Sequence, residues 1–298
     1  MSIKTVAVQG ATGNLGPFVV DALVDAGFKV VALSRNSSHP SQLNKAATVK
    51  QVNPEDASSV TSALQGSDAF VSVVGNSGFA QQSTLIDAAI SAGVKFFIPS
   101  EFGSNTENAK TAALPVFGAK IQTQKYLAEK KDKIGYAFIN NGAFLDWGLK
   151  NNFVINTSGG TTKLFDGGDA KFSATNLSDI GKAVAGILKN TEKYNGKFVH
   201  INTAVTTQNK LLAAAKKAGL NVDTEPASTA DVYKSSLETL QTGKGDIGAA
   251  MVGFLFSALF DSSYGNVYDQ QDSQDLGIKV LDDTGIEALV QQIASEKK

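Results

Sequence analysis

The sequence contains no cysteine and only two histidines among its 298 residues. The lack of cysteine excludes disulfides, thiolate nucleophiles and cysteine-ligated metal sites, and it fits a reducing compartment. His39 and His200 are isolated, and neither is spaced for a metal site or a catalytic triad. A Gly-x-Ser-x-Gly motif, a Walker loop and a pair of carboxylates at catalytic spacing are absent as well. These absences argue against metalloenzymes and triad hydrolases.

Strong charge bias and long apolar runs are also missing. The formal net charge is −1, so no bulk field attracts nucleic acid or an anionic membrane. The most apolar stretch, "IGAAMVGFLFSALF" (Ile247–Phe260), falls short of the roughly 20 residues that a membrane span needs. The N-terminus shows no basic region and no cleavage site. We therefore expect a cytoplasmic protein without a secretion signal or membrane anchor.

The first half of the chain alternates apolar strand-like segments with helix-like ones. This alternation predicts an α/β fold with a Rossmann-type, doubly wound parallel sheet covered by helices on both faces. The expected strands are Thr5–Val8, Lys29–Leu33, Val49–Val52, Ala69–Val74, Phe96–Pro99 and Tyr136–Ile139. The expected helices are Pro17–Ala26, Ala57–Leu64, Gln82–Ala92 and Ala112–Lys131.

Beyond residue 150 the pattern loosens. "NTSGGTTKLFDGGDAKFS" predicts a β-hairpin with glycine turns, and "NLSDIGKAVAGILKN" predicts a helix capped by Ser178. "KFVHIN" reads as a further strand and "TTQNKLLAAAKKAGL" as a further helix. We therefore expect a dinucleotide-binding domain over 1–150 and a smaller, substrate-binding α/β domain over 151–298, with some later segments returning to the first sheet.

A glycine-rich turn links the first strand to the first helix in "VAVQGATGNLG". Gly10 permits the tight turn, Gly13 leaves room for a pyrophosphate, and Gly16 lets the helix pack on the strand. The helix N-terminus adds free N–H groups, and Thr12 and Asn14 add side-chain donors. The cofactor-binding residues expected here are Gly10, Thr12, Gly13, Asn14, Leu15 and Gly16.

Arg35 ends the second strand, where an NAD-preferring site has Asp or Glu. A guanidinium suits a 2′-phosphate because it forms paired, charge-assisted hydrogen bonds and stacks on adenine. We therefore expect NADPH or NADP⁺ rather than NAD(H) as the cofactor.

Two later loops follow the fourth and fifth strands, "VVGNSG" and "FFIPSEFGSN". Ligands in open α/β sheets lie across the carboxyl ends of the strands. Gly75 and Asn76 would then pass close to the cofactor, and Ser100, Glu101 and Phe102 would border its nicotinamide end.

Two hypotheses compete for the proton donor. Tyr126 and Lys130 form a Tyr-x-x-x-Lys pair with Ser100 upstream, as in short-chain dehydrogenases, whereas Lys120 lies early in the same helix. Lys130 lies about 15 Å further along the helix axis than Lys120 and falls in the charged run "EKKDK". The beginning of the helix should lie beside the strand ends, so we favour Lys120 as the catalytic residue. We also expect Lys120 to bind the cofactor through a hydrogen bond to the nicotinamide ribose.

The segments "GATGNLG", "FIPSEFG" (Phe97–Gly103) and "PVFGAK" (Pro115–Lys120), together with Arg35, resemble the NmrA-like, isoflavone-reductase-like branch of the short-chain dehydrogenases. The resemblance runs along essentially the whole chain. It implies NADPH as hydride donor and Lys120 as the catalytic lysine. It also implies that Asn141, Gly142 and Phe144 border the nicotinamide and that Trp147 lines the substrate pocket.

Two functions fit this pattern. The first is an NADPH-dependent reductase of a small aromatic or quinonoid compound, and the alternative is an NADP(H)-sensing regulatory protein without catalysis. A lysine at position 120 favours the enzyme, because a sensor needs no acid there. Apolar walls suited to such a substrate would come from Phe102, Phe144, Trp147 and Phe254. We expect a monomer or homodimer whose partner is a small molecule, with no metal and no nucleic acid.

Overall fold

The computed structural model describes residues 2–35, 38 and 40–296, so His39 lies outside the described residues. The chain forms two compact units, each built from three segments. The first unit contains residues 1–102, 119–140 and 177–199, and the second contains residues 103–118, 141–176 and 200–298.

The first unit is organised around a seven-stranded sheet in the order β10-β6-β5-β4-β1-β2-β3. All pairings from β3 across to β6 are parallel. The strand order reverses between β1 and β4, which is the position where doubly wound sheets bind their ligands. This confirms the predicted Rossmann-type sheet. Its strands are β1 (Thr5–Gln9), β2 (Lys29–Ser34), β3 (Thr48–Gln51), β4 (Ala69–Ser72), β5 (Phe96–Ile98), β6 (Gly135–Asn140) and β10 (Lys197–His200).

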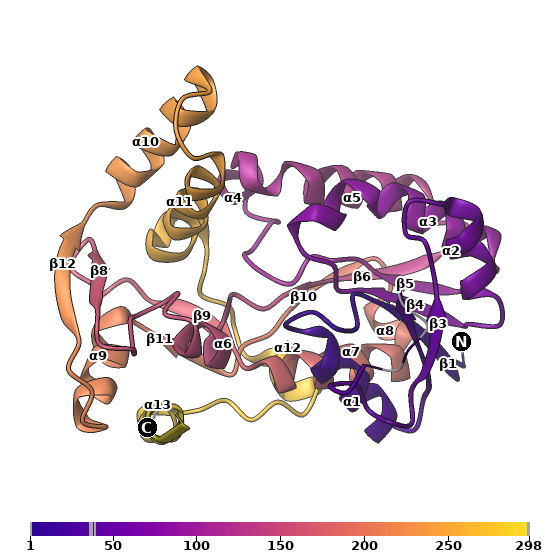
Figure 1. The fold of residues 1–298 in the computed structure, drawn as a ribbon, viewed down its shortest axis with the longest axis horizontal. Helices are drawn as coiled ribbons and strands as arrows, with labels where there is room; N and C mark the ends of the chain where they lie inside the picture. The colour runs from indigo at the N-terminus through magenta and orange to yellow at the C-terminus, as the bar shows by residue number, and fades with distance from the viewer. Residues whose placement is uncertain (1, 36–37, 39, 297–298) are drawn as a thin grey trace. The chain divides into compact units, whose positions relative to one another are not determined.

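Helices cover both faces of this sheet. Figure 1 shows α2, α3 and α5 on one face and α1, α7 and α8 on the other. The elements are α1 (Gly16–Asp25), α2 (Ala57–Leu64), η1 (Asn76–Gln81), α3 (Gln82–Ser91), α5 (Gly118–Glu129), α7 (Leu177–Lys189) and α8 (Thr191–Tyr194). Phe70 and Phe97 pack in the core beneath α2 and α3, with ring centroids 5.3 Å apart. The continuous apolar runs of the strands are therefore explained by burial on both faces.

Two helix predictions need correction. The expected helix Ala112–Lys131 is three elements, α4 (Ala109–Ala112), η2 (Pro115–Phe117) and α5. The break falls at Leu114, which is extended with ψ 133° because the following proline disfavours the helical conformation. The second correction concerns Ser178, which lies inside α7 because that helix already begins at Leu177.

The second unit contains two small sheets. In the three-stranded sheet, β9 (Phe172–Thr175) lies between β11 (Ala204–Thr206) and β7 (Ala143–Phe144). In the two-stranded sheet, β8 (Thr161–Phe165) pairs in parallel with β12 (Asp223–Ala227). The predicted hairpin is therefore wrong, because β8 and β9 pair with different, distant strands. The glycine turn between them is a local signal, whereas the pairings of β8 and β9 join segments that lie far apart in the chain.

Helices make up the rest of the second unit. α10 and α11 run side by side in Figure 1 and begin with side-chain caps from Ser228 and Asp246. Besides α4 and η2, the helices of this unit are α6 (Leu145–Lys150), α9 (Gln208–Lys217), α10 (Thr229–Thr242), α11 (Ile247–Phe260), η3 (Ser262–Tyr264), α12 (Gln271–Asp275) and α13 (Asp283–Glu296).

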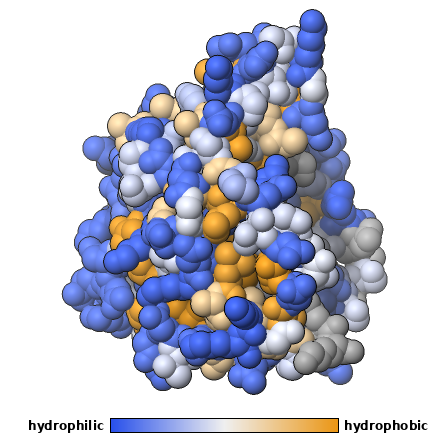
Figure 2. Space-filling model, turned by 90° about the vertical axis from the view of Figure 1, so that its left-hand side faces the viewer, coloured by the Kyte–Doolittle hydropathy of each residue, from blue (hydrophilic) through white to orange (hydrophobic). Residues whose placement is uncertain are grey.

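The apolar stretch Ile247–Phe260 forms α11. Within the described residues, no helix has both the length and the apolar character that crossing a membrane requires. Figure 2 shows a mostly hydrophilic face with an apolar band through its middle. Ile247 and Val252 of α11 are among the exposed large apolar side chains, at 43% and 37%.

Candidate functional site

The glycine turn after β1 is closely packed against the loop that follows β4. Gly10 has φ +83°, and a Cβ there would lie 2.7 Å from the carbonyl oxygen of Val73. A Cβ on Gly16 would lie 2.4 Å from backbone atoms of Ala11 and Gly10. The N–H of Gly13 donates to the Gly10 carbonyl at 3.0 Å and closes the turn. Larger residues at positions 10 and 16 would therefore force the turn open.

The N-terminus of α1 leaves its first N–H groups available. No described side chain caps this helix, and its first turn holds no acidic residue. Thr12, Gly13 and Asn14 are exposed beside it, whereas Leu15 is buried. Unsatisfied N–H groups and the positive end of the helix dipole together favour an anion.

Arg35 leaves the sheet at the same edge as the glycine turn. Gln9 pairs in register with Leu33, so Gly10 and Ser34 are the next residues on neighbouring strands. Arg35 is exposed, and its carbonyl accepts a hydrogen bond from Gln51 Nε2 at 3.2 Å. The guanidinium is thus carried by a backbone fixed at the edge where Gly10 begins the turn.

Gln82, the first residue of α3, ties the ends of β4 and β5 together. Its Nε2 donates to Ser72 Oγ at 2.9 Å, and its Oε1 accepts from the backbone N–H of Ser100 at 3.1 Å. Ser100 Oγ in turn donates to the Val74 carbonyl at 2.7 Å. Ser72, Gln82 and Ser100 are all buried. Sequence reasoning missed Gln82, because a glutamine at the start of a helix carries no local signal of such a role.

Lys120 meets the same loop from the first turn of α5. Its Nζ donates to the Glu101 carbonyl, and it lies 5.3 Å from the centre of the Phe79 ring. Lys120 is 8% exposed, and burial lowers the pKa of its amine, against an opposing effect of Glu101. Phe102, the next residue along the loop, adopts φ +24°. The predicted residues Ser100, Glu101 and Lys120 are thus held together, with Phe79 as a neighbour that the sequence did not reveal.

The competing pair, Tyr126 and Lys130, is engaged elsewhere on α5. Tyr126 donates its hydroxyl to the Asp87 carboxylate, with O···O distances of 2.7 and 2.8 Å. That hydrogen bond, together with partial burial, raises the pKa of Tyr126. Lys130 Nζ lies 4.8 Å from the centre of the Tyr126 ring. A phenol held by a carboxylate is poorly suited to exchange protons near neutral pH.

Gly75 and Asn76 lie on the loop after β4, where Asn76 opens η1. Gly75 is exposed, and no described atom lies within 4 Å of the position that its Cβ would take. The loop after β4 therefore leaves open space at Gly75, next to the Val73–Val74 backbone that packs on Gly10 and Ser100.

Asn141 and Gly142 belong to the second unit. Their backbone N–H groups both donate to the Gly103 carbonyl, at 3.0 and 2.9 Å. Gly142 has φ +63°, and a Cβ there would lie 2.0 Å from the Ser173 carbonyl oxygen. Thr175 Oγ1 donates to the Asn141 carbonyl at 2.6 Å. These contacts fix the backbone of the segment that follows β6.

The predicted aromatic residues of the second unit fall into two groups. Phe144 and Trp147 meet edge to face with centroids 6.5 Å apart, and Trp147 continues to Phe153 at 6.1 Å. Phe254 is fully buried instead, with its ring centroid 5.6 Å from that of Tyr233. It packs in a separate apolar core that includes Leu114.

The fold and these contacts define a class of protein. A parallel sheet whose strand order reverses beside a glycine turn and an open helix N-terminus is the dinucleotide-binding arrangement of Rossmann-type proteins. Among the described residues, no group of His, Asp or Glu is arranged to hold a metal ion. The chain belongs to the NmrA-like family, whose pattern matches residues 2–254, and this confirms the resemblance seen in the sequence.

Two curated relatives span most of the chain. Oxidoreductase aprR of Aspergillus flavus is 32% identical over 251 residues, covering 82% of this chain and 84% of that protein. Quinone oxidoreductase 2 of Escherichia coli is 29% identical over 272 residues, covering 87% and 91%.

Solved structures share the fold. The Escherichia coli NADPH-dependent quinone oxidoreductase QOR2, complexed with NADPH, matches 98% of this chain and 100% of its own, with a TM-score of 0.74 and 24% identity. AtPrR2 with NADP⁺ and (+)pinoresinol matches 98% and 99%, with a TM-score of 0.78 and 18% identity.

Proposed function

We propose that this chain is an NADPH-dependent reductase of a small aromatic or quinonoid compound, with Lys120 as the proton donor. The observation that carries the proposal is a continuous set of contacts along the carboxyl edge of the sheet. Gly10 packs on Val73, Val74 accepts from Ser100, and Glu101 accepts from Lys120. The relatives named as oxidoreductases and the similar structures solved with NADPH or NADP⁺ support the same function.

The residues of the first unit fit such a dinucleotide. The compact turn and the uncapped start of α1 would hold the pyrophosphate through backbone N–H groups. The exposed guanidinium of Arg35 would bind the 2′-phosphate. Gly75 and Asn76, with the loop from Ser100, would border the nicotinamide end.

NADPH, when bound, supplies the hydride that reduces the substrate. The substrate oxygen that gains electron density must then receive a proton. The buried amine of Lys120 is suited to this task, because burial lowers its pKa and makes the ammonium a stronger acid. The Glu101 carbonyl orients Nζ, and the proton lost by Lys120 is regained from water.

The test follows NADPH oxidation with a panel of quinones, enones and benzylic ethers. Lys120→Met should keep NADPH binding but lower turnover by about 100-fold or more, which is typical for the loss of a general acid. Lys125→Met on the exposed face of the same helix is the matched control and should leave turnover unchanged. Full activity in Lys120→Met would refute the assigned role.

Cofactor choice is tested separately. Arg35→Glu should erase or reverse the preference for NADPH over NADH in fluorescence titrations, and unchanged selectivity would exclude the 2′-phosphate contact. NADPH binding without turnover of any compound in the panel would favour the sensing function instead.

A further inference from the structure

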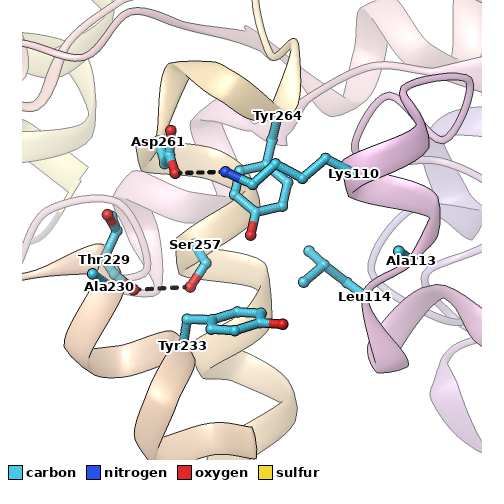
Figure 3. Close-up of a pocket in the computed structure, with 9 residues that line it drawn as sticks. All are labelled: Lys110, Ala113, Leu114, Thr229, Ala230, Tyr233, Ser257, Asp261 and Tyr264. Carbon is cyan, nitrogen blue, oxygen red and sulfur yellow. Dashed lines mark hydrogen bonds and ion pairs between the residues drawn. The ribbon is translucent and has the colours of Figure 1, made fainter.

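The second unit contains a pocket of about 380 Å³ that none of the predicted site residues lines. One wall comes from α4 and the residues after it (Lys110, Ala113 and Leu114). The opposite wall comes from the N-terminal turns of α10, the end of α11 and η3 (Thr229, Ala230, Tyr233, Ser257, Asp261 and Tyr264). Figure 3 shows these side chains around a common space, and its volume lies at the lower end of the range of about 300–1,000 Å³ typical of ligand sites.

Two phenol hydroxyls offer hydrogen bonds to this space. In Figure 3 the Tyr264 hydroxyl points toward the region between Leu114 and the ring of Tyr233. Within the described part of the chain, neither tyrosine hydroxyl has a hydrogen-bond partner. Burial, followed by the nearby Asp261 and Tyr233, raises the pKa of Tyr264, so its phenol stays protonated as a donor.

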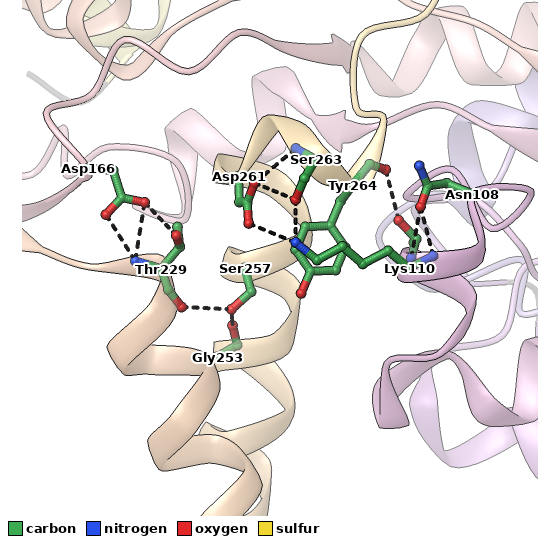
Figure 4. Close-up of polar contacts among 10 residues, drawn as sticks. Asn108, Lys110, Asp166, Thr229, Gly253, Ser257, Asp261, Ser263 and Tyr264 are labelled. Atoms are coloured by element: carbon green, nitrogen blue, oxygen red, sulfur yellow. Dashed lines mark hydrogen bonds and ion pairs between the residues drawn. The ribbon is translucent and has the colours of Figure 1, made fainter.

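The charges at the rim of the pocket balance each other. Lys110 Nζ lies 3.2 Å from Asp261 Oδ2, also bonds Ser263 Oγ, and lies 4.1 Å from the centre of the Tyr264 ring (Figure 4). A cation already paired with a carboxylate gives an anionic ligand little advantage. The pocket therefore suits a neutral ligand.

The polar groups behind the pocket are fixed. Ser257 Oγ donates to the Thr229 and Gly253 carbonyls, and Thr229 is held by the Asp166 carboxylate (Figure 4). The Tyr264 carbonyl accepts from Thr111 Oγ1 at 2.8 Å, which anchors η3 to α4. Both walls are thus held in place before any ligand arrives, which reduces the entropic cost of binding.

We propose that this pocket binds a neutral aromatic compound carrying a carbonyl oxygen, with the ring between Leu114 and Tyr233 and the oxygen accepting from Tyr264. Leu114, Ala113 and Ala230 supply apolar contacts, and the Tyr233 ring supplies a face for stacking. The site lies wholly within the second unit and does not depend on the proposed role of Lys120.

The test is isothermal titration of the full-length protein, without NADPH, using 1-tetralone and its hydrocarbon analogue tetralin. 1-Tetralone should bind more tightly than tetralin. Tyr264→Phe should weaken 1-tetralone about three- to tenfold, as expected for one hydrogen bond, and leave tetralin unchanged. Ala113→Trp, at an exposed helix end, should block both ligands by filling the pocket.

Tyr126→Phe is the matched control, because it removes a tyrosine hydroxyl from the first unit, and it should bind both compounds like the wild type. Equal 1-tetralone affinity in wild type, Tyr264→Phe and Ala113→Trp would overturn the proposal, and so would the absence of 1-tetralone binding to the wild type. Repeating the titration on Lys120→Met separates the two proposals. A pocket that binds 1-tetralone in a protein without reductase activity would uphold this inference alone.

Discussion

Replacing Gln82 by leucine should destabilise the first unit and reduce turnover together. The substitution keeps the apolar stem of the side chain but removes the two hydrogen bonds at 2.9 and 3.1 Å. Ser72 Oγ and the Ser100 N–H then lose a partner in a region where Ser72 is fully buried and Ser100 is 7% exposed. Each orphaned buried group costs about 1–3 kcal/mol, and the leucine returns part of that sum by apolar burial. We expect a net loss of about 2–3 kcal/mol in the free energy of unfolding.

Turnover should fall because Ser100 positions the loop on which the Lys120 amine is anchored. Urea unfolding followed by circular dichroism measures the first effect, and NADPH oxidation at saturating substrate measures the second. Gln122→Leu, at an exposed position of α5, is the matched control and should change the unfolding free energy by less than about 0.5 kcal/mol. An equally small change in Gln82→Leu would refute the network as a support of the site.

Two further predictions concern the glycine turn and the buried lysine. Gly16→Ala should reduce NADPH binding at least tenfold in fluorescence titrations, because the added Cβ would lie 2.4 Å from the backbone of Ala11. Wild-type NADPH affinity in a folded Gly16→Ala protein would show that the turn does not require a glycine at this position. Lys120→Met should stabilise the protein at pH 7, because burial lowers the pKa of the amine from its ordinary 10.5, so charging it opposes folding. The folded state then binds fewer protons than the unfolded state between the lowered pKa and 10.5, so wild-type stability rises with pH across that window and the advantage of Lys120→Met should shrink. Urea unfolding at pH 7 and pH 9.5 measures this difference, and a constant advantage would show that charging Lys120 costs nothing.

The sequence by itself determined the first sheet and its glycine turn. Continuous apolar strands separated by amphipathic helices allow few arrangements other than a parallel sheet covered on both faces. The spacing of Gly10, Gly13 and Gly16 reports a steric requirement within one short segment, so it can be read without knowing any distant contact. The sequence also placed Lys120 early in its helix, but the predicted helix began at Ala112 and ran through Pro115, so only the structure placed Lys120 in the first turn of α5.

Only the tertiary structure decided which distant groups meet. The role of Gln82 depends on Ser72 at the end of β4 and on Ser100 in the loop after β5, and no local pattern encodes that convergence. The pairing of β8 with β12, in place of a hairpin with β9, joins segments about sixty residues apart, and no local pattern indicates it. Burial of the Lys120 amine likewise arises from the loops that surround it. Local steric limits and hydrophobic periodicity depend only on consecutive residues. Burial and hydrogen-bond partners, in contrast, arise when segments far apart in the chain pack together.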